Sequence, residues 1–115
     1  MSGMNNNLTF VTTESISAGD MIELDALGYA EKASTETTTF VGVAITDKAA
    51  EDELAVQTQG VVTLTASAAI APGTKVMVDS SDATKIEAAD AYNKVIGIAT
   101  EKAAADGDEI EVLLK

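Results

Sequence analysis

The chain has 115 residues, of which 46% are hydrophobic and 3% aromatic, and 19 acidic residues against 7 basic ones give it a net charge of −12. A chain of this length forms one domain at most, and its hydrophobic content argues against disorder. The lack of cysteine and histidine excludes disulfides, thiolate metal sites and the commonest catalytic bases and nucleophiles. The few lysines form no cluster, which excludes nucleic acid as a partner because phosphate backbones are bound by grouped basic residues.

The beginning of the chain, MSGMNNNLTF, lacks the basic and apolar regions of a secretory signal peptide. No apolar run is long enough to span a membrane, so we expect synthesis in the cytoplasm and no membrane partner. Residues 1–8 include glycine and three consecutive asparagines, a composition that favours a flexible N-terminal arm. Residues 9–115 are predicted to form a single all-β domain.

Alternation of apolar and polar residues predicts short strands from residue 8 onward. In DMIELD, Ile22 and Leu24 should face a core while Glu23 faces solvent. Similar patterns predict further strands in LTFVT at 8–12, FVGVAIT at 40–46 and ELAVQT at 53–58.

The same patterns return in the same order in the second part of the chain. The stretch ISAGDMIELD matches IAPGTKVMVD, VGVAITDKAA matches IGIATEKAAA, and further strands are predicted in GVVTLT and EIEVLL. Ile16 and Ile70 are 54 residues apart, whereas Leu54 and Ile110 are 56 apart, so small insertions separate the copies. We place two related halves at about 14–58 and 68–114.

Glycines occupy matched positions in the two copies. Gly19 and Gly73 lie in predicted turns before a strand, where a glycine reaches positive φ without strain. Gly42 and Gly97 interrupt β-branched runs, where glycine marks a bulge or a close backbone approach.

These patterns predict an all-β fold, a small barrel or sandwich of about nine or ten short strands with an internal pseudo-twofold repeat. We expect each half to offer an open apolar face that only the other half can cover. Duplication of the unit would then close the core.

Polar clusters that could carry chemistry have simpler structural interpretations. Ser80 or Ser81 could pair with Lys85, but DSSDATK is typical of a polar hairpin loop. The sequence PGTK has the glycine and lysine of a phosphate-binding loop and lacks its first glycine and its helix.

The acidic residues near the C-terminus lead to the same conclusion. Asp106, Asp108 and Glu109 match only part of a calcium-binding loop, and the dipeptide at 106–107 is typical of a hairpin turn. Glu109 and Glu111 could be a glycosidase pair, but they alternate with apolar residues and so form the solvated face of one strand. We predict no catalytic, cofactor-binding or metal-binding residues.

The paired blocks, together with VQTQGVVTL between them, resemble the capsid cement or decoration proteins of tailed bacteriophages over residues Ile16 to Leu114. The resemblance implies a non-enzymatic all-β protein that binds the outer surface of an expanded capsid and stabilises it against internal DNA pressure. It implies the major capsid protein as a partner, self-association as a homotrimer, and a location on the capsid exterior of the virion.

The N-terminal arm runs directly into the first predicted strand. A segment of this kind can add to a neighbouring sheet edge by backbone pairing. We therefore expect capsid contacts from Asn5, Asn6, Asn7, Leu8 and Thr9.

Two other functions stay open. A small β-barrel module that binds a ligand or glycan, as part of a fibre or adhesin, would need a pocket and an aromatic platform. The chain offers only scattered aromatic residues, Phe10, Tyr29, Phe40 and Tyr92. An enzyme of unknown type is disfavoured because each candidate residue has a structural explanation.

Overall fold

A computed structural model describes residues 7–114 of the chain. The first five strands are β1 (Asn7–Val11), β2 (Met21–Leu24), β3 (Ala30–Lys32), β4 (Phe40–Ala44) and β5 (Glu53–Gln57). The next five are β6 (Gly60–Thr65), β7 (Lys75–Val78), β8 (Ile86–Ala88), β9 (Gly97–Ala99) and β10 (Glu109–Leu114), with a short 3₁₀ helix at Tyr92–Lys94. Residues 1–6 of the predicted arm lie outside the described residues. The last two residues of the predicted arm, 7 and 8, belong to β1.

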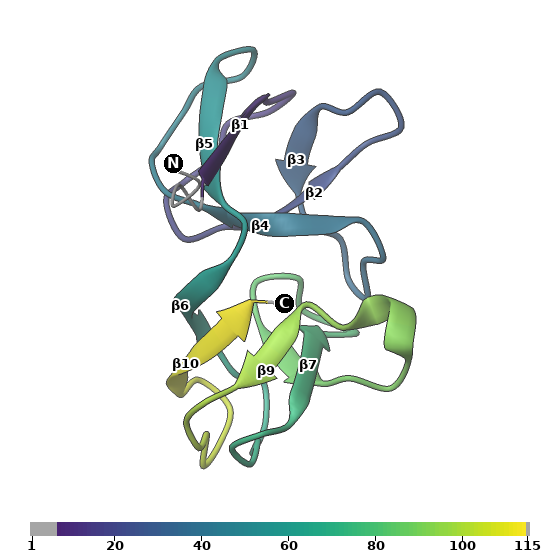
Figure 1. Ribbon diagram of the computed structural model, residues 1–115, viewed down its shortest axis with the longest axis vertical. Helices are drawn as coiled ribbons and strands as arrows, with labels where there is room; N and C mark the ends of the chain where they lie inside the picture. Colours follow the sequence, from purple (N-terminus) through teal and green to yellow (C-terminus); the bar gives the residue numbers. More distant parts are fainter. Residues whose placement is uncertain (1–6, 115) are drawn as a thin grey trace, which may run out of the picture.

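The strands form two antiparallel sheets of five strands with the same connectivity (Figure 1). The strand order is β1-β5-β4-β2-β3 in the first sheet and β6-β10-β9-β7-β8 in the second, so each strand has a counterpart five strands later. The predicted all-β fold with an internal repeat is confirmed. Because β1 and β6 belong to the repeat, the halves are residues 7–57 and 60–114, which is longer than predicted.

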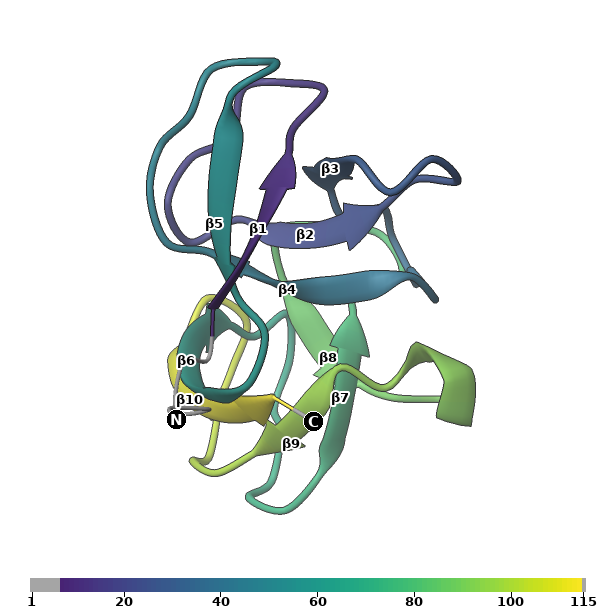
Figure 2. The ribbon, with the colours of Figure 1, turned by 45° about the horizontal axis from the view of Figure 1, so that its top comes forward.

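Neither sheet closes into a barrel (Figure 2). The edge strands of each sheet approach at a single parallel bridge, between Thr12 and Ala30 in the first and between Ala66 and Ile86 in the second. One residue pair does not continue a ladder of hydrogen bonds. Of the two predicted architectures, the structure is therefore consistent with the sandwich.

The two copies agree in individual hydrogen bonds of their turns. The N–H of Gly19 donates to the carbonyl oxygen of Ala44 at 2.8 Å, and that of Gly73 donates to Ala99 at 2.7 Å. Both glycines have positive φ, 93° and 87°, which confirms the predicted turns.

The glycines inside the strands mark close backbone approaches, as predicted. A Cβ atom at Gly97 would lie 2.5 Å from the carbonyl oxygen of Leu113, and one at Gly42 would overlap the carbonyl oxygen of Gln57. The ladder between β2 and β4 also shifts register next to Gly42, which is the predicted bulge.

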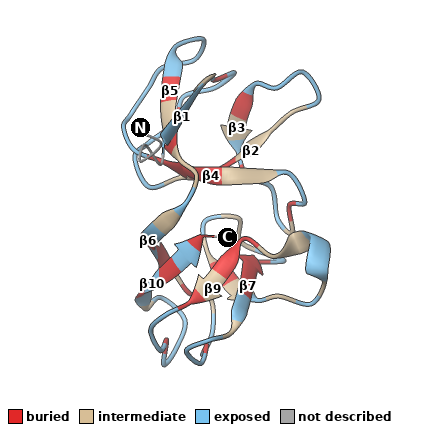
Figure 3. Ribbon diagram, viewed as in Figure 1, coloured by how far each residue is buried: buried red, intermediate tan, exposed pale blue. Residues whose placement is uncertain are grey.

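The buried apolar residues form two clusters (Figure 3). Ile16, Ile22, Ala30, Ala44, Leu54 and Val56 form the smaller one, entirely within the first half. The larger cluster fills the second half and includes Met21, Ala33 and Val43 of the first half. Neighbouring strand residues point to opposite faces, so the first sheet has its own core on one face and the second half on the other. The expectation that each half covers the core of the other is therefore wrong for the first half, whose core contains only its own residues. Only the core of the second half includes residues of both halves.

Candidate docking surfaces

An ion pair joins the two halves beside their apolar contact. The backbone N–H of Glu36 donates to the carbonyl oxygen of Val78 at 3.3 Å, and its carboxylate accepts from Nζ of Lys94 at 2.6 Å. Lys94 also reaches Asp90 at 3.3 Å. The hydrogen bond to Glu36, followed by that to Asp90, raises the pKa of Lys94 above its ordinary value. These contacts hold the loop before β4 against the second half.

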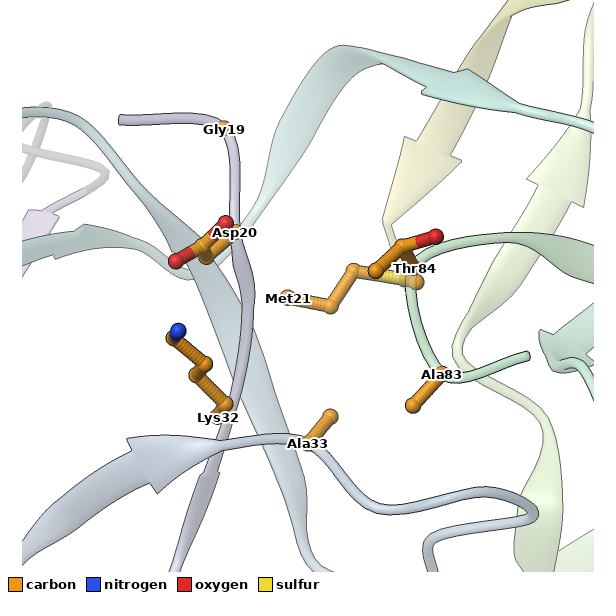
Figure 4. A pocket seen from close by; sticks show the side chains of 7 residues that line it. All are labelled: Gly19, Asp20, Met21, Lys32, Ala33, Ala83 and Thr84. Atoms are coloured by element: carbon orange, nitrogen blue, oxygen red, sulfur yellow. The ribbon is translucent and has the colours of Figure 1, made fainter. Parts of the chain in front are cut away.

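A hollow of about 250 Å³ lies next to this contact (Figure 4). Met21 and Ala33 face Ala83 and Thr84 across it. Its remaining lining residues are Gly19, Asp20 and Lys32. Ligand pockets are usually larger, roughly 300–1,000 Å³, with several polar groups converging on the ligand. The hollow is therefore a packing gap at the junction, and it does not favour a ligand- or glycan-binding module.

The hairpin between β7 and β8 is held by the buried carboxylate of Asp79. This carboxylate accepts hydrogen bonds from the hydroxyl of Ser67, from the N–H and hydroxyl of Ser81 at 2.9 and 3.0 Å, and from the N–H of Asp82 at 3.0 Å. The bond from Ser67, above all, holds the pKa of Asp79 below its ordinary value. The predicted polar hairpin loop at this position is confirmed.

The serine and lysine of this loop do not face each other. Ser81 donates to Asp79, whereas Nζ of Lys85 lies 2.8 Å from a carboxylate oxygen of Asp106. The hydrogen bond to Asp106 raises the pKa of Lys85. Ser81 and Lys85 therefore do not form a pair.

The other candidate motifs are also structural. Gly107 has a φ of 95°, which confirms the hairpin turn, and Asp108 accepts from two backbone N–H groups at 2.8 and 3.2 Å. Glu109 and Glu111 are exposed on the outer face of β10, as predicted, and the PGTK turn leads into β7. Within residues 7–114, no group of three or more histidine, cysteine, aspartate or glutamate side chains is placed to hold a metal ion.

The structure describes three of the five residues predicted to contact a capsid. Asn5 and Asn6 lie outside the described residues. Asn7, Leu8 and Thr9 are exposed in β1 and pair with β5 of the same chain. Since β1 is an edge strand, any pairing with another protein would use its opposite edge.

The exposed large apolar side chains of residues 7–114 include two groups that the sequence analysis did not single out as contact surfaces. The first, which we call the hairpin tip, consists of Leu27 and Tyr29 between β2 and β3, with 80% and 41% exposure. The second, the apolar row, consists of Val61, Leu113 and Ile98, paired across β6, β10 and β9. Val61 and Leu113 are 51% and 43% exposed, and Ile98 is half-buried.

A sequence signal for the apolar row exists. GVVTLT contains two adjacent apolar residues and EIEVLL contains three, which breaks the alternation of a strand with one solvated face. At least one residue of each run must point outward. Such an outward residue marks a candidate contact surface.

Within residues 7–114, no helix is long and apolar enough to cross a membrane. The duplicated antiparallel sheets, tight glycine turns and exposed apolar surfaces define a class of small all-β modules that is suited to docking. The chain matches the phage cement protein family over residues 2–114 and belongs to that family. The resemblance noted in the sequence is thereby confirmed.

Among solved structures, the head fiber gp8.5 N base of bacteriophage phi29 is similar to this chain. The match has a TM-score of 0.66 and 17% sequence identity, and it covers 95% of this chain and 92% of the other. At this identity the likeness shows a shared fold. No curated protein matches the chain.

Proposed function

We propose that this chain is a non-enzymatic structural protein that binds the outer surface of an expanded phage capsid and stabilises the shell against internal DNA pressure. The observation that carries the proposal is the match to the phage cement protein family over nearly the whole chain. The fold shared with the base of a phage head fiber supports it. The major capsid protein is the proposed partner, and the proposed form is a homotrimer on the virion exterior after synthesis in the host cytoplasm.

The physical properties of the chain suit this role. A shell displays many equivalent binding positions, so modest individual affinities combine into durable attachment when an oligomer contacts several of them. The net charge of −12 keeps the free protein soluble before assembly.

Edge strand β1 is the proposed capsid contact, together with the residues before it. Asn7, Leu8 and Thr9 are exposed, and Leu8 is 54% exposed in spite of its apolar side chain. An edge strand can accept a further strand by backbone pairing, while Leu8 adds an apolar anchor. Asn5 and Asn6 extend the proposed contact toward the N-terminus.

The test is to mix the protein with expanded capsids that lack it. We expect the protein to sediment with the capsids, to give density on the outer lattice in electron micrographs, and to raise the temperature at which DNA is released. Unexpanded capsids serve as the control. Failure to sediment with expanded capsids at protein concentrations that saturate their surface would contradict the proposal.

A truncated protein tests the contact residues. Deleting residues 1–6 leaves β1 complete, whereas deleting residues 1–9 would remove part of its pairing with β5. We expect the shorter deletion and Leu8→Asp to weaken capsid binding without changing the far-ultraviolet circular dichroism spectrum. Full binding by both variants would exclude this strand as the contact.

A further inference from the structure

The contact between the halves joins two different kinds of surface. The first half contributes a sheet face, on which Met21, Ala33 and Val43 are buried. The second half contributes its β7–β8 hairpin, from which Ala83 packs against the same cluster (Figure 4). A contact of this kind is heterologous, so the counterpart of each surface remains free on the other half.

The β7–β8 hairpin, which covers the first sheet, corresponds to the β2–β3 hairpin of the first half. The β2–β3 hairpin carries the hairpin tip, which is exposed. The two hairpins match, because the N–H of Asp25 donates to the Tyr29 carbonyl and the N–H of Asp79 donates to the Lys85 carbonyl, both at 2.9 Å. The carboxylate of Asp25 further accepts from the N–H groups of Leu27 and Tyr29 at 2.9 and 3.0 Å. These bonds fix the backbone that presents the two exposed apolar side chains.

The free counterpart of the covered sheet face includes the apolar row. In the first sheet, cross-strand pairs connect Asn7, Gln57, Val43 and Met21. In the second sheet, the corresponding pairs connect Val61, Leu113, Ile98 and Lys75. The second half covers the apolar end of the first row, whereas in the second row Val61 and Leu113 are exposed and Ile98 is half-buried.

The two rows differ in where their apolar residues lie. Val43 and Ile98 are equivalent, but the second row is apolar on β10 and β6, where the first row has polar residues. The second row ends at the exposed Lys75, in place of the buried Met21. Within the chain, the docked hairpin lies over the β2 end of the first row. A hairpin that docks on the second row would lie further from the equivalent β7 end, with the positive charge of Lys75 at its side.

We propose that the apolar row of one copy binds the hairpin tip of a second copy of this chain. The inference rests on the self-association put forward under Proposed function and names the surfaces that make it. Each copy offers its hairpin tip to one neighbour and its apolar row to the other, so the contact closes into a ring or continues as a filament. Attraction between Lys75 of one copy and Asp25 of the next opposes the repulsion between two chains of net charge −12.

Mass measurement tests this contact in solution. By sedimentation equilibrium, we expect an oligomer for the wild type and a dissociation constant raised about 30-fold or more for Leu27→Asp and for Leu113→Asp, because each places a charge at the centre of an apolar contact. Leu113→Thr keeps strand propensity and should act in the same direction if the aspartate variant folds poorly. Tyr92→Asp, at an exposed residue outside both surfaces, should leave the mass unchanged.

Cysteine cross-linking tests the pairing of the two surfaces, since the chain has no cysteine of its own. Single variants Leu27→Cys and Leu113→Cys are mixed and oxidised. We expect a disulfide-linked heterodimer in high yield. Leu27→Cys mixed with Tyr92→Cys, at a residue that is 86% exposed elsewhere, should give much less.

Several results would overturn the inference. A wild-type monomer at every concentration up to the millimolar range would do so, as would wild-type oligomerisation in the Leu27 and Leu113 variants. Loss of capsid binding by Leu113→Asp at unchanged mass would assign the row to the capsid. Greater thiol reactivity of the Leu113→Cys variant after deletion of residues 1–6, also at unchanged mass, would assign it to the N-terminal segment. If the oligomer depends on Leu27 and Leu113 but does not bind capsids, the result would contradict the proposed function and leave this inference standing.

Discussion

The two halves have the same strand order but unequal cores. In the second half, Val78 and Ile96 are buried, whereas Leu24 and Val41 at the corresponding positions of the first half are only partly buried. The larger cluster, in the second half, also includes residues of the first half, whereas the smaller cluster includes no residue of the second half. The comparison teaches that turn geometry and strand pairing preserve this unit even where its core packing is weaker.

The largest expected effect comes from truncating one core residue in each half. Leu54 and Ile110 are equivalent and buried, at 0% and 2% exposure. Leu54 pairs with the half-buried Phe10, which can move into a gap, whereas Ile110 pairs with the buried Leu64. We expect Ile110→Ala to lower the free energy of unfolding by about 4 kcal/mol and Leu54→Ala by about 2–3 kcal/mol.

Urea unfolding followed by circular dichroism measures both variants. The reverse order of destabilisation would show that the second core is not the better packed one. The same curves test whether residues 9–115 form a single domain, which stays a prediction. One transition in each variant is expected, and two separate transitions would contradict it.

An intermediate effect is expected at Asp79, whose carboxylate collects hydrogen bonds from two serines and a backbone N–H. We expect Asp79→Ala to destabilise the protein by about 2 kcal/mol at neutral pH, because hydroxyl and N–H donors lose a charged acceptor. Thermal unfolding measures the loss. Asp25→Ala, in the exposed counterpart hairpin, is the matched control and should have a smaller effect.

The pH dependence of this effect has a definite sign. The pKa of Asp79 is lowered from its ordinary value of 3.8, so the unfolded chain binds this proton more readily than the folded chain. Its contribution to stability is complete above the ordinary pKa and disappears as the pH falls through the lowered folded pKa. The difference between wild type and Asp79→Ala should therefore shrink below pH 3.8, and a difference that stayed constant there would contradict the assignment.

The smallest expected effect concerns a turn position at which the halves differ. Glu51 and Gly107 make equivalent hydrogen bonds, to Thr12 at 2.7 Å and to Ala66 at 2.8 Å, with φ values of 72° and 95°. A residue with a Cβ is strained there and glycine is not. We expect Glu51→Gly to stabilise the protein by about 0.5–1 kcal/mol, and Gly107→Ala to destabilise it by about 1–2 kcal/mol. Destabilisation by Glu51→Gly in thermal unfolding would mean that its side chain compensates for the strain.

Much of the fold could be predicted because its signals are local. Alternation and β-branched runs placed eight of the ten strands, and the matched glycines located the repeat and its turns. The strands β3 and β8 were not placed individually, since each has three residues and only one that is buried. Met77 points to the opposite face of β7 from Val76 and Val78, yet all three are buried. Both faces of this strand are therefore covered by tertiary packing.

The surfaces proposed for docking were harder to predict. Nothing local distinguishes the exposed Leu27 from the buried Leu54, because exposure depends on which segments pack above a side chain. Alternation places Leu113 on the solvated face of its strand, but whether another segment covers it is decided by the tertiary structure. The turn at 106–107 and the solvated strand face at Glu109 and Glu111 could be predicted, since turn chemistry and strand alternation are local properties.

The sequence by itself determined the strands, the glycine turns, the duplication and the resemblance to phage cement proteins, because backbone sterics and side-chain period act within a few residues. Only the tertiary structure decided that the cores are separate and that one half covers the outer face of the other. Burial is a property of contacts between distant segments, and two similar halves can meet in more than one way. The arrangement that they adopt leaves the hairpin tip and the apolar row exposed.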